Sequence, residues 1–392
     1  MKAATALAPV STEAGPWWHQ SLGTGAPGIA LRHIANARTG AGAWETAHRW
    51  AAAMTRHPVN AHSEVAGLFR GAPAVAFALH TADHPAYAHA LTGLDRTVNV
   101  LVRERLARAH QRIDTGHPAP LREFDLIRGL TGLGIYLLHR RPSWHLLRDV
   151  LAYLVRLAEP LDGGQMPGWW SGDGPEGRPS DQWPHGHINF GLAHGIAGPL
   201  ALLAAAQRRA IVVTGQAEAV SRIMDVLDQW QQGEGATAWW PGLITPAQWQ
   251  AGTATSSGPQ RPSWCYGTPG LARAQQVAAL ALGDPARQQR AERALAACIR
   301  DEKQLSQLTA ASVCHGWAGL IQTVHRAAAD DSTGELAVLL PDVHARMGHY
   351  LDVHGLPEHG GLLEGADGIH LASASVNTPP ATDWDACLLL NG

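Results

Sequence analysis

The stretch RPSWCYGTPG, from Arg261 to Gly270, places a cysteine two residues before a Gly-x-x-Gly that opens an apolar run. Forty-nine residues further on, SVCHGWAG, from Ser312 to Gly319, repeats the arrangement. Cys314 again lies two residues before the first glycine of its motif, and His315 lies one residue before it. Two cysteines and a histidine in the same phase of two repeat units are placed to share one metal ion.

The glycine motif recurs along most of the chain. Its first glycines are separated by 46, 58, 66, 72, 49 and 49 residues, and recurrence on this scale is typical of repeat architectures. A unit of 46 to 49 residues has room for two helices and two connections, so each unit is predicted to be a helical hairpin. Seven copies begin at Gly25, Gly71, Gly129, Gly195, Gly267, Gly316 and Gly365, the second being degenerate because Ala74 replaces its closing glycine.

Two kinds of helix alternate in the pattern. The runs that follow the glycines, such as Gly195 to Gln207 and Gly267 to Leu282, are apolar on nearly every side and are predicted to be inner helices. Between them lie amphipathic segments whose apolar residues follow the i, i+3, i+4, i+7 spacing of an outer helix, such as Leu147, Val150, Leu151 and Leu154. The sequence therefore predicts an all-α fold, an α/α toroid of seven helical hairpins in a single domain over residues 1–392.

The longer spacings must hold additional segments. Asp95 to Leu121 contains the β-leaning TVNVLV and a proline-rich end, and it is predicted to be a small insertion. The Gly/Trp/Pro-rich segments Leu161 to His187 and Gly233 to Gln260 are predicted to be loops over the mouth of the toroid. Their tryptophan pairs are candidates either to grip a peptide or merely to cap the core.

Composition excludes several classes of function. The chain has 392 residues, is 45% hydrophobic and carries a formal net charge of −3, so it lacks the basic footprint of a nucleic-acid-binding protein. No apolar run reaches the roughly 18 residues of a membrane-spanning helix, and the N-terminus lacks the pattern of a signal peptide. Four cysteines are too few for a disulfide framework in a chain of this length. We therefore expect a cytoplasmic protein with small-molecule or peptide partners.

The repeat phase also predicts a site. If each first glycine lies at the same end of its inner helix, the residues just before these glycines gather on one rim. The first, second and seventh repeats offer little there, with Thr24, Arg70 and Glu364. The other repeats place Asp125, Arg128, His194, Arg261, Cys265, Cys314 and His315 on the rim.

These residue types fit catalysis at a zinc ion. Cys265, Cys314 and His315 supply three ligands, and a fourth position left open is typical of a catalytic zinc site. Zinc with two thiolate ligands binds a substrate thiol and lowers its pKa while the sulfur remains nucleophilic. His194 can then act as acid or base, Asp125 can orient it, and Arg261 can hold an enolate. Cys298 and Cys387 are predicted to be buried packing residues.

Several motifs in this order resemble the lanthionine synthetase C family (LanC). They are FDLIRGLTG from Phe124, NFGLAHGIAG from Asn189, WCYGTPG from Trp264, SVCHGWAG from Ser312, and the C-terminal LLEGADGIHLA and DWDACLLL. The resemblance spans essentially the whole chain. It departs from the family at Phe124, where a tyrosine is common, and at Ala74.

The resemblance implies a seven-hairpin toroid with zinc bound by Cys265, Cys314 and His315. It implies the addition of peptide cysteine thiols to dehydroalanine or dehydrobutyrine, which forms lanthionine or methyllanthionine rings. It places His194, Arg261 and Asp125 in the active site, with Tyr266 lining it. The implied partners are a dehydrated precursor peptide with a leader and a separate dehydratase.

Two other functions remain open from the sequence. One is a zinc-dependent thiol transferase on the same fold, either glutathione-adding or prenyltransferase-like, which would use a different electrophile. Prenyl diphosphate would require a basic patch, for which Arg128 and Arg261 are a thin supply. The other is a non-catalytic peptide-binding scaffold that retains zinc. The intact set of Asp125, His194 and Arg261 argues against it.

Overall fold

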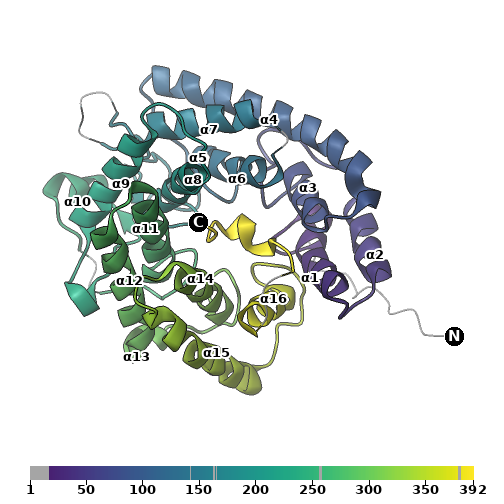
Figure 1. The fold of residues 1–392 in the computed structure, drawn as a ribbon. Helices are drawn as coiled ribbons and strands as arrows, with labels where there is room; N and C mark the ends of the chain where they lie inside the picture. Colours follow the sequence, from purple (N-terminus) through teal and green to yellow (C-terminus); the bar gives the residue numbers. More distant parts are fainter. Residues whose placement is uncertain (1–16, 142, 162–163, 165, 256–257, 378–380) are drawn as a thin grey trace.

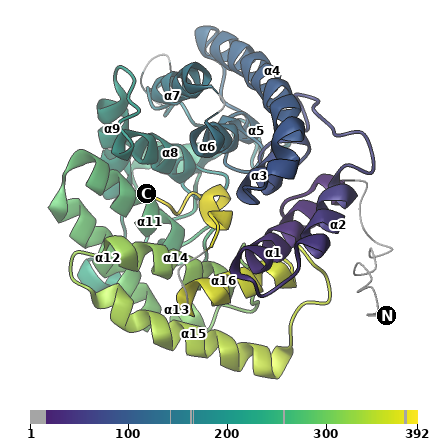
Figure 2. The same ribbon diagram turned by 45° about the vertical axis from the view of Figure 1, so that its right-hand side comes forward.

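The computed structural model describes residues 17–141, 143–161, 164, 166–255, 258–377 and 381–392. Seven inner helices each begin next to the first glycine of a repeat, and they contact one another in chain order, the last contacting the first to close a ring (Figure 1, Figure 2). They are α1 (Ala26–Thr39), α3 (Ala72–Thr81), α6 (Leu130–Arg140), α8 (Ala197–Arg208), α11 (Thr268–Leu282), α14 (Trp317–Asp330) and α16 (Ala366–Asn377).

Six of the inner helices are each followed by an outer helix. These outer helices are α2 (Trp44–Met54), α4 (Ala88–Asp114), α7 (Trp144–Leu157), α9 (Gln216–Trp230), α12 (Pro285–Arg300) and α15 (Glu335–His354). The predicted α/α toroid is therefore confirmed. Within the described residues the seventh inner helix, α16, is followed by the 3-10 helix η4 (Trp384–Leu388) rather than by a further outer helix.

Burial separates the two layers as the sequence pattern predicts. Ten consecutive residues of α8, from Ala197 to Ala206, are buried, whereas α9 buries a stripe that includes Val220, Ile223 and Leu227. Short elements lie in the segments that connect the long helices: helices α5 (Leu121–Phe124), α10 (Pro246–Ala251) and α13 (Glu302–Leu305), the 3-10 helices η1 (Trp18–Gln20), η2 (Pro85–Tyr87) and η3 (Gly235–Thr237), and strands β1 (Ile188–Asn189) and β2 (Leu243–Ile244). None of the described helices is both long and apolar enough to cross a membrane.

The predicted insertion is built into the outer layer. Residues 95–114 belong to the 27-residue helix α4, which packs against α3, α6 and α7, and Leu121 begins α5. The expected strand tendency of Thr97 to Val102 is wrong. Val98, Leu101 and Val102 face the core at helical spacing together with Leu106 and Ala109, and this burial outweighs local β propensity.

The two tryptophan-rich loops pair through β1 and β2, which are antiparallel with Ile188 opposite Ile244. Trp169 and Trp240 are buried, and the Trp240 Nε1–H donates to the Leu227 carbonyl at 2.8 Å. These two side chains cap the core. Trp170 and Trp239, the other members of the two pairs, are only partly buried, so a role for them in holding a peptide stays a prediction.

The glycines let each loop fold back onto its own inner helix. Gly267 has a φ of 93°, which favours glycine, and a Cβ there would lie 2.3 Å from the Arg261 carbonyl oxygen. A Cβ at Gly270, one turn later, would lie 2.1 Å from the Trp264 carbonyl oxygen. The close approach of these backbones explains the two glycines of the motif, and it holds the preceding residues at the end of the helix.

The loops before the inner helices are joined into a circle, which we call the rim belt. At six of the seven junctions a backbone N–H of one loop donates to a backbone carbonyl of the next, at N–O distances of 2.8 to 3.3 Å. The donor and acceptor pairs are Leu363 and Gly23, Leu22 and Phe69, Leu126 and Ala193, Leu192 and Cys265, Cys265 and Cys314, and Cys314 and Leu363. The predicted gathering of the pre-glycine residues on one rim is thus observed.

A buried arginine closes the seventh junction. The Arg105 guanidinium, from α4, donates to the carbonyls of Ser63 at 2.8 Å and Ala66 at 2.6 Å on one side. On the other side it donates to the Arg128 carbonyl. Burial lowers the pKa of Arg105 to about 10, so the group remains charged at neutral pH.

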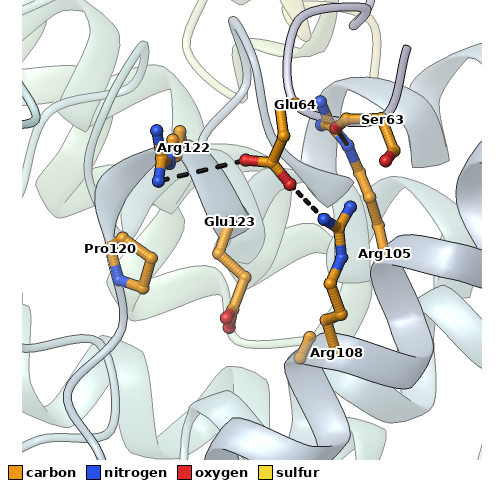
Figure 3. A pocket seen from close by; sticks show the side chains of 8 residues that line it. Ser63, Glu64, Arg105, Arg108, Pro120, Arg122 and Glu123 are labelled. Carbon is orange, nitrogen blue, oxygen red and sulfur yellow. Dashed lines mark hydrogen bonds and ion pairs between the residues drawn. The ribbon is translucent and has the colours of Figure 1, made fainter. Parts of the chain in front are cut away.

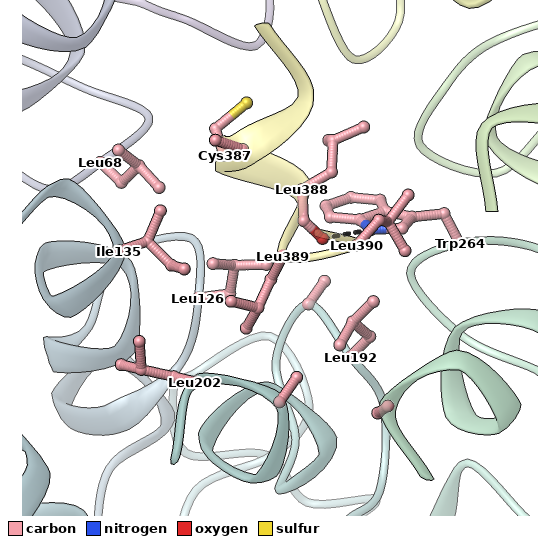
Figure 4. Packing of buried hydrophobic residues seen from close by; sticks show 14 of the residues in the cluster. Leu68, Leu126, Ile135, Leu192, Leu202, Trp264, Cys387, Leu388, Leu389 and Leu390 are labelled. Carbon is pink, nitrogen blue, oxygen red and sulfur yellow. Dashed lines mark hydrogen bonds between the residues drawn. The ribbon is translucent and has the colours of Figure 1, made fainter. Parts of the chain in front are cut away.

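The C-terminal segment fills the centre of the ring (Figure 1, Figure 4). Leu388, Leu389 and Leu390 are buried there. The Leu388 carbonyl accepts a hydrogen bond from Trp264 Nε1 and the Leu390 carbonyl accepts one from Arg273 Nε, both at 2.9 Å. The chain end therefore packs directly against the residue that precedes Cys265.

Replacing Arg105 by methionine should destabilise the toroid. The side-chain length is kept, but one buried and two partly buried carbonyls lose their donor, which we expect to cost about 3 kcal/mol. Arg103→Met, at an exposed position of the same helix, is the matched control. Urea unfolding followed by circular dichroism measures both variants, and equal stability of the two would contradict the role given to Arg105.

Candidate active site

The rim belt sets the two cysteines of the predicted metal site side by side. The Cys265 N–H donates to the Cys314 carbonyl at 3.3 Å, and both residues are free thiols. The Cys314 thiol donates to the Cys265 sulfur, which lowers the pKa of Cys265 to about 6 although its burial opposes this, and raises the pKa of Cys314. One of the two sulfurs is therefore readily available as a thiolate ligand.

His315 and a carboxylate complete the cluster. One ligand atom each from Cys314, His315 and Glu364 lie within 4.8 Å of one another. His315 Nδ1 lies 3.4 Å from Glu364 Oε1, and this contact raises the pKa of His315. Thiolate, imidazole and carboxylate are donors that zinc accepts, so Cys314, His315 and Glu364 fit the ion, and the Cys265 sulfur lies next to that of Cys314 outside this group.

A histidine–carboxylate pair lies two loops away along the belt. His194 Nδ1 lies 2.7 Å from Asp125 Oδ2. The other carboxylate oxygen of Asp125 accepts the backbone N–H groups of Arg128 and Gly129, both at 2.7 Å, at the start of α6. Because an ionised carboxylate only accepts, Nδ1 of His194 carries the proton and Nε2 is left to exchange one.

The His194–Asp125 pair lies at the edge of a cavity. Asp125 is buried, whereas the His194 side chain is 34% exposed. Both line a cavity of about 430 Å³ that also contacts Arg122 and Arg128. His194 can therefore meet a substrate while its orienting carboxylate stays away from water.

Tyr266 lies between His194 and the cysteines. Its ring centroid is 6.5 Å from that of His194, and its hydroxyl accepts a hydrogen bond from Asn189 Nδ2 at 2.9 Å. Burial raises the pKa of Tyr266 to about 12, so the phenol remains a hydrogen-bond donor at neutral pH. The Asn189 contact was not predicted from the sequence, since nothing in the repeat phase marks β1.

Arg261 faces the same cluster. Its charge contributes to lowering the pKa of Cys265 and opposes protonation of His315. Its Nε is buried and makes no hydrogen bond to the described residues. The described residues therefore leave this N–H without an acceptor.

Comparison with known proteins identifies the family. The family model for lanthionine synthetase C-like proteins matches residues 16–389. The chain belongs to the lanthionine synthetase C-like family. This LanC-like protein is 25% identical to the nisin biosynthesis protein NisC of Lactococcus lactis subsp. lactis over 332 residues, which cover 82% of this chain and 77% of NisC.

A solved structure agrees on the fold. The structure of nisin cyclase superposes with a TM-score of 0.79 at 21% identity, covering 95% of this chain and 93% of the other. The resemblance inferred from the motifs is therefore confirmed, and so is the toroid. At the coarser level the relatives support a function like that of lanthionine cyclases.

Sequence reasoning missed one member of the site in this LanC-like protein. Glu364 was read as unremarkable, yet it lies against Cys314 and His315. The signal was available, because Glu364 precedes Gly365 just as His315 precedes Gly316 and His194 precedes Gly195. A carboxylate just before the first glycine of one repeat is therefore placed to contact the same rim residues of the neighbouring loop.

Glu364→Gln should lower the pKa of His315 in metal-free protein. The carboxylate favours the charged imidazolium, so removing its charge makes His315 lose its proton at lower pH. NMR titration of the histidine ring signals measures the shift. Glu218→Gln, at an exposed position of α9, should leave it unchanged, and an unaltered His315 pKa in Glu364→Gln would refute the pairing.

Proposed function

We propose that this LanC-like protein is a zinc-dependent peptide cyclase. It adds the cysteine thiol of a dehydrated precursor peptide to dehydroalanine or dehydrobutyrine and so forms lanthionine or methyllanthionine rings. The observation that carries the proposal is one rim that bears two neighbouring free thiols and the His194–Asp125 pair, which lines a cavity of about 430 Å³. The nisin biosynthesis protein NisC and nisin cyclase, by their names, support the same class of reaction.

Cys265, Cys314 and His315 are the residues that would hold the zinc ion. When bound, zinc would lower the pKa of the substrate thiol and keep its sulfur nucleophilic. Glu364 contacts the His315 ring and so fixes its orientation. The buried Cys265 and half-buried Cys314 keep the ligand atoms largely away from water.

The chain's own residues move the proton and hold the charge. The substrate sulfur forms a bond to the β-carbon of the dehydrated residue, and the electron pair of the double bond moves toward the carbonyl as an enolate. Arg261 holds that enolate through its unpaired guanidinium. Nε2 of His194 takes up the proton that the substrate thiol gives up and delivers it to the α-carbon, with Asp125 fixing the ring, and Tyr266 stays a neutral donor beside it.

The proposed chemistry also implies partners and a compartment. A separate dehydratase must supply the dehydrated residues of the leader-bearing precursor peptide. The thiols of substrate and enzyme must stay reduced, and all four cysteines of this chain are free. We therefore place the protein in the cytoplasm, where thiols are kept reduced.

Cys314→Ala should abolish zinc binding and ring closure together. Metal analysis gives the zinc content, and mass spectrometry after thiol alkylation counts the rings formed on a dehydrated peptide. Cys298→Ala is the matched control, because Cys298 is buried on α12 and its thiol donates to Gln304. If Cys314→Ala still closed rings faster than the uncatalysed background, the metal role would be wrong.

Asp125→Asn should reduce the turnover number by about 10²- to 10⁴-fold while leaving zinc content unchanged. The asparagine amide would donate its N–H to Nδ1 of His194. The imidazole proton would then lie on Nε2, and Nε2 could no longer accept a proton. Asp114→Asn, at an exposed ion pair of α4, should keep full activity. Offering prenyl diphosphate or glutathione with a small electrophile in place of the dehydrated peptide separates the cyclase from the thiol transferases.

A further inference from the structure

At the position just before the first glycine, two repeats have arginine and four have residues of the candidate active site. The residue just before the first glycine occupies the same place in every loop of the rim belt. In repeats four to seven this place holds His194, Tyr266, His315 and Glu364, and in repeats two and three it holds Arg70 and Arg128. Arg128 therefore lies in the repeat next to that of His194 and lines a cavity with it, and Arg70 lies one repeat further along the rim.

The positive charge extends outward from there. The cavity of about 430 Å³ that contains His194 and Arg128 also touches Arg122. Arg122 in turn lines a second cavity of about 180 Å³ between α4 and α5, together with Arg108 (Figure 3). We call Arg70, Arg128, Arg122 and Arg108 the arginine groove.

The acidic groups near the groove neutralise only its outer end, where Glu64 pairs with Arg108 and lies 3.9 Å from Arg122. The other carboxylates that line the two cavities are engaged by residues outside the groove: Asp125 by His194, Glu123 by Arg112 and Tyr153, and Glu176 by Arg178.

Two of the arginines have no acidic partner. The Arg128 side chain forms no ion pair or hydrogen bond with the described residues, and Arg70 lies over the Trp17 ring at 5.6 Å. Burial and the charge of Arg128 lower the pKa of Arg70, which reports mutual repulsion. The chain as a whole carries a net charge of −3, so this positive excess is local.

We propose that the arginine groove binds an acidic segment of the peptide substrate, with its Asp and Glu side chains on Arg122 and Arg128 and the reacting residues next to His194. The proposal rests on the proposed function and names how that site holds its peptide. Arg128, Arg122 and Arg108 line two cavities that share Arg122 rather than converging on one point, which suits spaced carboxylates better than one phosphate group.

The test uses the full chain and a fluorescent peptide that carries four acidic residues but no cysteine or dehydrated residue. Anisotropy should show tighter binding of this peptide than of its Asn/Gln counterpart, weakening with salt. Arg122→Gln with Arg128→Gln should weaken binding of the acidic peptide about tenfold. Arg222→Gln with Arg293→Gln, at exposed positions of α9 and α12, is the charge-matched control and should bind as the wild type does.

Kinetics separate this proposal from the cyclase proposal. With a dehydrated peptide that has an acidic segment, the groove variant should raise KM about tenfold and leave kcat within about twofold. If the wild type closes rings but the groove variant binds the acidic peptide equally well, the groove fails and the cyclase stands. If the acidic peptide binds through the two arginines but no ring closes, the cyclase fails and the groove stands. Displacement of the probe by micromolar inorganic diphosphate, with no preference for the acidic over the amide peptide, would also overturn the groove.

Discussion

The circle of backbone hydrogen bonds between successive loops is the constraint on which the site depends. Each bond joins an N–H and a carbonyl of the main chain, so it fixes where a loop lies without specifying its side chains. Cys265 and Cys314 are neighbours because their own backbone groups form one of these bonds. Residues almost 200 positions apart, from Asp125 to Cys314, are thereby brought to one rim.

The circle requires both a closed ring and a filled centre. Seven inner helices that contact one another in order leave an axial space, and the C-terminal leucines occupy it. The carbonyls of this segment are paired with Trp264 and Arg273, and its Asp385 carboxylate is paired with Arg326 at 2.5 Å. Since Trp264 adjoins Cys265, packing along the axis also supports the loop that carries the first thiol.

The sequence was sufficient for the features that repeat. Periodic glycines and the alternation of apolar and amphipathic segments predict the inner and outer helices, and their phase predicts that Asp125, His194, Cys265 and Cys314 meet. Features that occur once were not predictable. Arg105 acts from an outer helix through backbone carbonyls that no pattern marks, and the strand preference of Thr97 to Val102 is overridden by burial along α4. The zinc ligands and catalytic roles themselves stay predictions, because they depend on atoms that repeat phase does not place.

The arginines of the rim lie at different distances from the two thiols, and the distance affects the chemistry of the sulfur. A guanidinium held tightly against a sulfur lowers the pKa of the thiol, and nucleophilicity falls with it. The thiols have Arg261 near them, whereas Arg70 and Arg128 stand on the far side of the His194 loop. The arginines proposed to hold a peptide are thus separated from the thiols by at least one repeat. Substitutions at such separated positions act nearly independently, so a toroid of equivalent loops can change what it binds without disturbing how it reacts.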